Sequence, residues 1–113
     1  MHGERYGLEF DERTLACALF EVENARGVVL FGHGLGVSCH DDTVVRPARL
    51  LNEQGFIVFA PELPLHGERG GSGTDWQEVV SSWAAFWAGD GRNQLVDEWL
   101  HVLAHVEKKY DLP

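Results

Sequence analysis

Hydrophobic and polar residues alternate near the start of the chain. Tyr6, Leu8 and Phe10 are separated by polar or small residues, and a second extended run covers residues 15–22. The polar residues 11–13 lie between the two runs. Alternation with a period of two is typical of strands that bury one face, so the pattern predicts a β-hairpin.

Two continuous apolar runs follow, Val28–Phe31 and Phe56–Pro61, as expected for strands covered on both faces of a parallel sheet. Residues 41–43 are good helix N-caps, and Gly55 marks where a helix would end. One face of that helix carries the apolar residues Val44, Ala48 and Leu51. Strand, helix and strand together predict a right-handed βαβ unit.

Helical patterns fill the rest of the chain after a glycine- and proline-rich segment. The first is marked by Trp76, Val80, Trp83 and Trp87, which we expect to be mostly core, and residues 89–91 interrupt it. The second has one apolar stripe formed by Leu95, Trp99, Leu103 (or Val102), Val106 and Tyr110. We therefore predict a single α/β domain over residues 1–113, in which a hairpin precedes a parallel βαβ unit and helices cover both faces of the sheet.

Charge and hydropathy exclude several classes of function. The chain has 18 acidic and 9 basic residues, a net charge of −9, and its basic residues are scattered, so we expect no nucleic-acid partner. No segment approaches the roughly 20 apolar residues of a membrane span. The first residues lack the basic start and apolar core of a signal peptide, which predicts a cytoplasmic protein without membrane contact.

Cysteine and histidine spacings do not indicate a metal site. Cys17 and Cys39 fit neither a metal motif nor a disulfide framework, and we interpret them as small packed hydrophobes. His101 and His105 are four residues apart, a spacing at which two imidazoles can share a metal, but the glutamate of a zinc-protease helix is missing between them. We expect both on a solvated face beside residues 97–98, and we expect no metal and no cofactor.

A glycine-rich turn follows the first buried strand. Gly32, Gly34 and Gly36 surround His33, and glycines at such a place allow a backbone to come close to a ligand. One alternative is a dinucleotide-binding turn, G-x-G-x-x-G. Its sixth position here is Val37, however, so a small nucleotide or metal binder remains the weaker interpretation.

The order hairpin, strand, "HGLG" turn, helix, strand and "PELPLHGERG" resembles the N-terminal half of the α/β-hydrolase fold family. In that family the third strand ends in an HG-type turn, and the fourth runs into a "D-x-P-x-H-G-x" segment. The resemblance covers about residues 5–73, and the helix ending "KKYDLP" looks like the one that leads into the family's nucleophile strand. The segment "PLHGER" resembles the corresponding segment of esterase and prolyl-peptidase-like members more than that of lipases.

The resemblance implies a role for the turn. It would supply one backbone N–H of an oxyanion hole, which in this sequence is the N–H of Leu35. Gly34 and Gly36, lacking Cβ atoms, would leave room for a substrate carbonyl, whose developing charge such a donor stabilises by several kcal/mol. The alternative is that the glycines serve only a tight turn between the strand and the helix and have no role in catalysis.

Three further residues follow from the resemblance as candidates around the turn. His33, which could act as a base because imidazole titrates near neutrality, is expected to pack beneath the turn and orient it. Glu62, at the carboxyl end of the fourth strand, is either a substrate contact in the crevice or a hydrogen-bonded carboxylate. With Gly34 these form the predicted substrate-binding set, and His66 is expected to shape its loop.

The nucleophile elbow G-x-S-x-G is missing from the sequence. The nearest match, Gly70 to Thr74, ends in threonine and follows no apolar strand. The serine, acid and histidine of the family would lie outside these residues. We therefore expect the N-terminal part of an ester- or amide-cleaving hydrolase, inactive as an isolated chain and acting on a substrate only when completed. The alternative is a non-catalytic binding or dimerisation module.

The resemblance also predicts a partner. In the family the third strand lies between the fourth and the fifth, so Val28–Phe31 would have an unpaired apolar edge here. Such an edge is a template for another strand. We expect a homodimer or a complementary chain at this edge.

Overall fold

The computed structural model describes residues 3–66, 69 and 76–111; the segment 70–74, the nearest match to a nucleophile elbow, lies outside the described residues. β1 (Glu4–Phe10) and β2 (Arg13–Phe20) pair antiparallel. The connection is tight because Asp11 and Glu12 both take positive φ angles, of 51° and 62°, as two-residue hairpin turns require.

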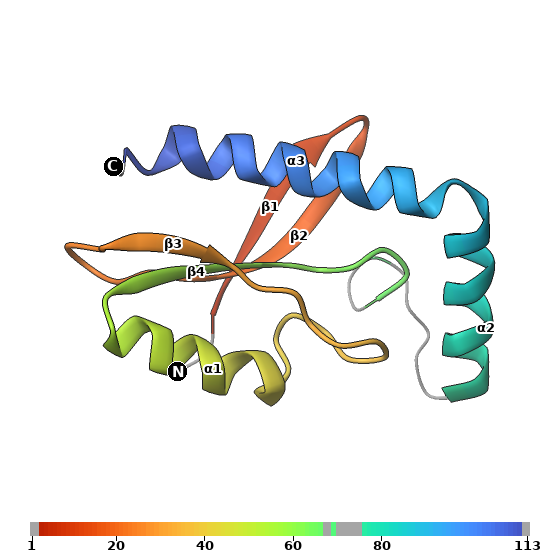
Figure 1. The fold of residues 1–113 in the computed structure, drawn as a ribbon, viewed down its shortest axis with the longest axis horizontal. Coiled ribbons are helices and arrows are strands. Elements are labelled where there is room, and N and C mark those ends of the chain that lie inside the picture. Colours follow the sequence, from red (N-terminus) through yellow and green to blue (C-terminus); the bar gives the residue numbers. More distant parts are fainter. Residues whose placement is uncertain (1–2, 67–68, 70–75, 112–113) are drawn as a thin grey trace.

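The hairpin belongs to a four-stranded sheet with the order β1-β2-β4-β3 (Figure 1). β4 (Phe56–Pro61) pairs antiparallel with β2 and parallel with β3 (Gly27–Leu30). α1 (Asp42–Glu53) connects β3 to β4, and its N-cap Asp41 accepts a hydrogen bond from the Thr43 N–H. Among the described residues, no strand pairs with the outer edge of β3.

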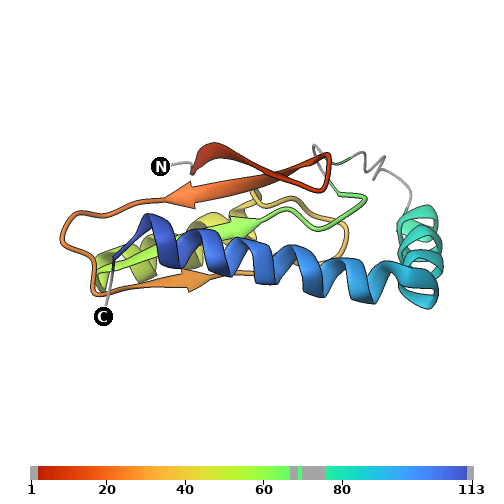
Figure 2. The same ribbon diagram turned by 90° about the horizontal axis from the view of Figure 1, so that it is seen from above.

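Two apolar layers cover the two faces of the sheet, and this confirms a mixed α/β fold. Side chains of β2 alternate between them, since Leu15, Cys17 and Leu19 belong to one layer and Ala18 and Phe20 to the other. The first layer is completed by the helix α3 (Arg92–Lys109), through Val102 and Val106, and the second by α1. Figure 2 shows α3 lying across the sheet, with its end near the start of β3.

α2 (Trp76–Phe86) lies beyond the end of the sheet (Figure 1). The segment η2 (Trp87–Gly91) joins it to α3, and the non-helical Gly89 within η2 changes the direction of the chain. No side chain of α2 is buried, and Trp76 is 60% exposed. The expectation that these tryptophans are core was therefore wrong for Trp76 and Trp87, because the helix does not pack on the sheet.

On the apolar stripe of α3, the structure selects Val102 of the two predicted residues, because Val102 faces the sheet and Leu103 is exposed. The expected solvated face was wrong: the His101 ring stacks on Phe10 with centroids 4.4 Å apart, and His105 Nε2 lies 2.8 Å from the Tyr6 hydroxyl. Two aromatic residues of β1 thus cover these histidines. In the described part of the chain, no helix is both long and apolar enough to cross a membrane.

Candidate functional site

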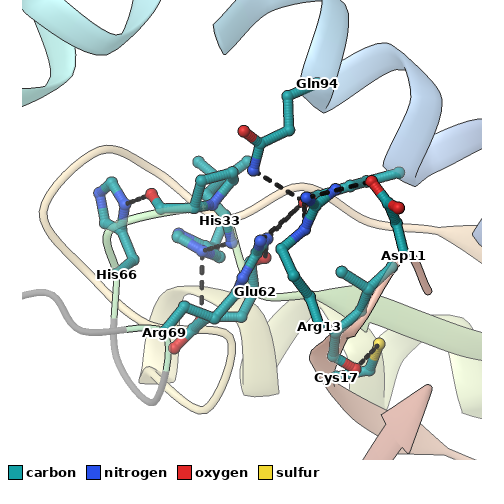
Figure 3. A network of polar contacts seen from close by, with 12 residues as sticks. Asp11, Arg13, Cys17, His33, Glu62, His66, Arg69 and Gln94 are labelled. Carbon is teal, nitrogen blue, oxygen red and sulfur yellow. Dashed lines mark hydrogen bonds and ion pairs between the residues drawn. The ribbon is translucent and has the colours of Figure 1, made fainter. Parts of the chain in front are cut away.

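The turn after β3 and the loop after β4 lie together at the carboxyl ends of these strands. β3 and β4 are parallel, so the segments that follow them begin at the same end of the sheet. Open α/β sheets usually bind their ligands at this carboxyl end. The turn contains Gly36, whose φ of +85° lies in the left-handed region that favours glycine. Figure 3 shows the polar contacts that hold these two segments.

His33 is buried beneath the turn and contacts both segments. Its Nδ1 lies 2.7 Å from the Gly34 carbonyl oxygen, and its Nε2 accepts a hydrogen bond of 2.9 Å from the Leu63 N–H. A backbone N–H can only donate, so this hydrogen bond uses the tautomer with its proton on Nδ1, whereas a ring with a proton on Nε2 would donate to Glu62 instead. Nε2 also lies 3.2 Å from a Glu62 oxygen, which would receive the Nε2 proton of a charged ring.

His66 makes the reverse connection. Its Nε2 accepts a 2.9 Å hydrogen bond from the Gly36 N–H, and its Nδ1 lies 2.9 Å from the Pro64 carbonyl oxygen. The same reasoning assigns the tautomer with its proton on Nδ1 to this hydrogen bond. The two imidazoles meet edge to face, with centroids 5.2 Å apart. Each histidine thus ties its own segment to the other one.

Glu62 follows β4 directly and is only 3% exposed. Its backbone N–H donates to the Ala16 carbonyl at 2.8 Å, and its carboxylate accepts the Cys39 N–H at 2.6 Å. Burial raises the pKa of this carboxyl, but the His33 ring and the Cys39 N–H together outweigh burial and hold the pKa below its usual value. The carboxylate therefore anchors the end of the turn from inside the protein.

The two cysteines are packed in the interior, as the sequence predicts. Burial raises the pKa of the Cys17 thiol to about 12, and burial next to Glu62 raises the pKa of Cys39 as well. A thiol with a raised pKa carries little thiolate at neutral pH and is a poor nucleophile.

Leu35 presents its backbone N–H at the middle of the turn. Within residues 3–66, 69 and 76–111, no group accepts a hydrogen bond from it. The preceding Gly34 is exposed, and a Cβ there would make only ordinary contact with Val37, at 3.8 Å. A Cβ on Gly36 would instead lie 2.7 Å from the Trp76 ring. The turn thus has an open side at Gly34 and a closed side at Gly36.

A buried ion-pair network fixes the loop after β4 to α3 (Figure 3). Glu98 accepts two hydrogen bonds from Arg69, at 2.6 and 2.7 Å, and one from Gln94 at 3.0 Å. Arg13 contributes an ion pair at 3.3 Å, and Arg69 also donates to the Glu62 carbonyl at 3.2 Å. Sequence reasoning placed Glu98 on a solvated face. The missed signal was an acid on the same helical face as Val102 and Val106.

No cluster of three or more potential metal ligands occurs in the part of the chain that the structure describes. His101 and His105, the pair with metal spacing, instead contact the Glu9 carbonyl oxygen and the Tyr6 hydroxyl.

In a comparison with known proteins, the fold of this chain is similar to part of a solved esterase structure. No protein-family model matches the chain, and no curated protein matches it. A solved structure that does match is the PEG-bound complex of a novel cold-adapted esterase from an Arctic intertidal metagenomic library, with 25% identity and a TM-score of 0.69. The match covers 93% of this chain and 44% of the esterase. The chain is an α/β-hydrolase-like unit that corresponds to less than half the length of that esterase.

Proposed function

We propose that this chain supplies the oxyanion-binding turn of an α/β-hydrolase that cleaves esters or amides, with the Leu35 N–H as the donor. The observation that carries the proposal is that this N–H has no acceptor in the described chain, although its neighbours are held on both sides. The Gly36 N–H and the Leu63 N–H are each occupied by a histidine. The Leu35 N–H is therefore available in a turn that these two histidines hold in place.

Such a donor fits the chemistry of acyl transfer. When a nucleophile attacks an ester or amide, the carbonyl oxygen gains negative charge, and a donor already in position stabilises it without reorganisation. One donor of this kind contributes about 3–4 kcal/mol. Gly34 is exposed and would give the carbonyl its approach, whereas His33 and Glu62 are buried and would support the turn from beneath.

The nucleophile, acid and base of the reaction would come from polypeptide outside these 113 residues. α1 carries the chain from β3 to β4 on one face of the sheet, and α3 lies on the other face. The Tyr110 hydroxyl at the end of α3 donates to Glu21, directly after β2, at 2.8 Å, and this end of the helix lies near the start of β3 (Figure 2). A right-handed connection from β4 through α3 would then place a further parallel strand at the outer edge of β3.

That placement is what the proposed reaction needs. A strand parallel to β3 would have its carboxyl end beside the turn that carries Leu35. A nucleophile on the sharp turn after such a strand would face the same carbonyl as the Leu35 N–H. The supplied strand belongs either to a continuation of α3 or to a complementary chain.

The test of the donor uses the 113-residue chain and acetamide, a small uncharged carbonyl compound. In ¹⁵N-labelled protein, acetamide should shift the Leu35 amide signal more than those of Gly36 and Leu63, whose N–H groups are occupied. Leu35→Ala keeps the N–H and should keep the response, and Leu35→Pro should abolish it in a protein that retains the remaining amide signals. A Leu35 signal unmoved at saturating acetamide would overturn the assignment.

A fluorophosphonate probe tests whether the nucleophilic serine lies outside these 113 residues. The chain alone should not react with it, because the proposed serine lies elsewhere. Covalent labelling of these 113 residues would show an activated serine among them and contradict this part of the proposal.

A second candidate function is a non-catalytic binding or dimerisation module. It is favoured by the free edge of β3 together with exposed apolar residues on α3. Trp99 lies next to Gly32 at the end of β3, and on the same side of the helix the exposed apolar residues are Val96, Leu100 and Leu103. A strand edge and an apolar helix flank thus form one unpartnered surface on the described chain, which would bind a second copy or a complementary chain.

Sedimentation at micromolar concentration distinguishes the partners. The Phe31 N–H bonds to the Phe59 carbonyl of β4, so the alternating N–H of Val28 points to the outer edge. Val28→Pro removes an edge donor but no bond to β4. A wild-type dimer that Val28→Pro dissociates supports a homodimer through the edge of β3. A monodisperse wild-type monomer excludes the homodimer, and the partner at this edge would then be a complementary chain.

A further inference from the structure

We propose that Trp76, Trp83 and Trp87 form an aromatic binding face beside the turn, which takes the flat, uncharged acyl group of the ester or amide. The assignment rests on the proposed function, because the carbonyl of the same ligand would bind the Leu35 N–H. It names a substrate class, aromatic acyl compounds.

The first support is the position of Trp76. Its ring lies against Gly36, where a methyl group would come within 2.7 Å of it, and Gly36 directly follows Leu35. The ring is nevertheless 60% exposed, so one side of it remains open. A ligand whose carbonyl lies at Leu35 would therefore have an indole ring within reach of its substituent.

The second support is the way the other two rings are held. Trp83 meets the His66 ring at 5.5 Å and 78°, the edge-to-face geometry of favourable aromatic pairs. Trp87 stacks on Trp83 with centroids 6.1 Å apart and an angle of 26°, and it is 43% exposed. Because His66 also accepts the Gly36 N–H, one histidine connects the turn to the aromatic face.

The third support is charge. Among the residues of α2 only Glu78, in the first turn, is ionisable, although the whole chain carries a net charge of −9. The helix is not part of the core, since none of its side chains is buried. Trp83 and Trp87 stack on each other and Trp76 and Trp87 are exposed, so these rings suit a planar apolar group, and the nearby acids Glu78 and Asp90 disfavour an anion.

The Leu35 N–H beside the aromatic face indicates which kind of ligand the face would bind. An apolar patch without a polar neighbour would suit the apolar surface of another protein, but this patch borders a backbone N–H that can donate to a carbonyl. An aromatic acyl compound satisfies both features with one molecule.

The experiment compares two amides that share a carbonyl and differ by a phenyl ring. Acetamide and phenylacetamide are titrated into the ¹⁵N-labelled chain, with the Leu35 amide and the Trp76 indole N–H as reporters. Phenylacetamide should bind about 5- to 10-fold more tightly, the range expected when one ring pairs with an exposed indole, and should move both signals. Trp76→Leu should reduce the ratio to about 1 without weakening acetamide binding, as expected from a lost aromatic pair.

The control is Leu50→Ala, which removes an exposed apolar side chain on α1 and should leave the ratio unchanged. Equal affinities for the two amides, or a preference that survives Trp76→Leu, would overturn the aromatic face while leaving the Leu35 proposal intact. A phenyl preference without any Leu35 response would overturn the Leu35 proposal and, with it, the acyl assignment. Indole signals that shift with protein concentration alone would assign the face to a second copy and overturn the proposal.

Discussion

His33 and His66 each accept a backbone N–H from the segment that carries the other. Leu63 donates to His33, and Gly36 donates to His66. The two differ in what surrounds them: Glu62 lies 3.2 Å from His33 Nε2, whereas the His66 ring packs against the rings of His33 and Trp83 and its Nδ1 lies 2.9 Å from the Pro64 carbonyl oxygen.

Replacing His66 by its two amide analogues should separate its two hydrogen bonds. Gln places an oxygen near the Nε2 position and can accept the Gly36 N–H, whereas Asn reaches only the Nδ1 position. We expect His66→Asn to lower the free energy of unfolding by about 1–3 kcal/mol and His66→Gln by less. Urea unfolding measures the loss, and hydrogen exchange of the Gly36 amide locates it. Equal exchange rates in the two variants would contradict this role.

The two glycines that flank Leu35 should respond differently to alanine. At Gly36 the positive φ and the Trp76 ring both oppose a Cβ, so Gly36→Ala should cost about 1–2 kcal/mol or more. Gly34→Ala meets only ordinary contacts and should change stability by less than about 0.5 kcal/mol. Thermal and chemical unfolding of the pair provide the comparison. A Gly34→Ala variant as unstable as Gly36→Ala would show that the turn needs glycine throughout.

Glu62 should make stability depend on acid pH. Burial raises the pKa of its carboxyl, but His33 and the Cys39 N–H lower it by more, so the folded pKa lies below the usual 4.5. A lowered folded pKa contributes stability that is present above about pH 4.5 and lost as the pH falls through the folded value. The difference in unfolding free energy between wild type and Glu62→Gln should therefore shrink below pH 4.5. A constant difference from pH 7 to pH 3, measured with urea, would refute the anchoring role.

Glu98 should be the most sensitive acid on α3. Glu98→Ala leaves Arg69, whose side chain is 9% exposed, without its bidentate partner, and breaking such a buried pair costs about 3–5 kcal/mol. Asp97→Asn, on the exposed side of the same helix, should be nearly neutral. In Glu98→Ala the Leu63 amide should also exchange faster, because Arg69 holds the Glu62 carbonyl. Similar unfolding midpoints for the two variants would refute the network.

Residue patterns predict the sheet better than the helices that surround it. The apolar run of β4 follows from burial on both faces, whereas β2 is also buried on both faces and β3 is half-buried along its outer edge. α2 has an equally clear helical period but does not pack on the sheet. The period of apolar residues predicts that a helix has an apolar face, but it does not predict which part of the protein covers that face. The buried Glu98 was missed for a related reason, because its partners Arg13 and Arg69 come from distant segments.

At the candidate site, composition and spacing indicate the turn but not how it is held. The glycines and His33 could be singled out because they follow a buried strand directly. The bond from Gly36 to His66 could not, since it depends on how two segments meet thirty residues apart. The contact between Trp76 and Gly36 likewise depends on the bend at Gly89.

The apolar layer under α3 joins opposite ends of the chain, and this sets an order for its formation during synthesis. Leu8, Leu15 and Leu19 leave the ribosome early, but their partners Val102 and Val106 emerge more than 80 residues later. The layer under α1 needs nothing beyond Ala60 and can close first. Until α3 arrives, one face of the nascent sheet stays bare and is a target for chaperones. Chains arrested after residue 66 should accordingly expose the Leu8, Leu15 and Leu19 layer and exchange the backbone amides of β2 faster than the full chain does.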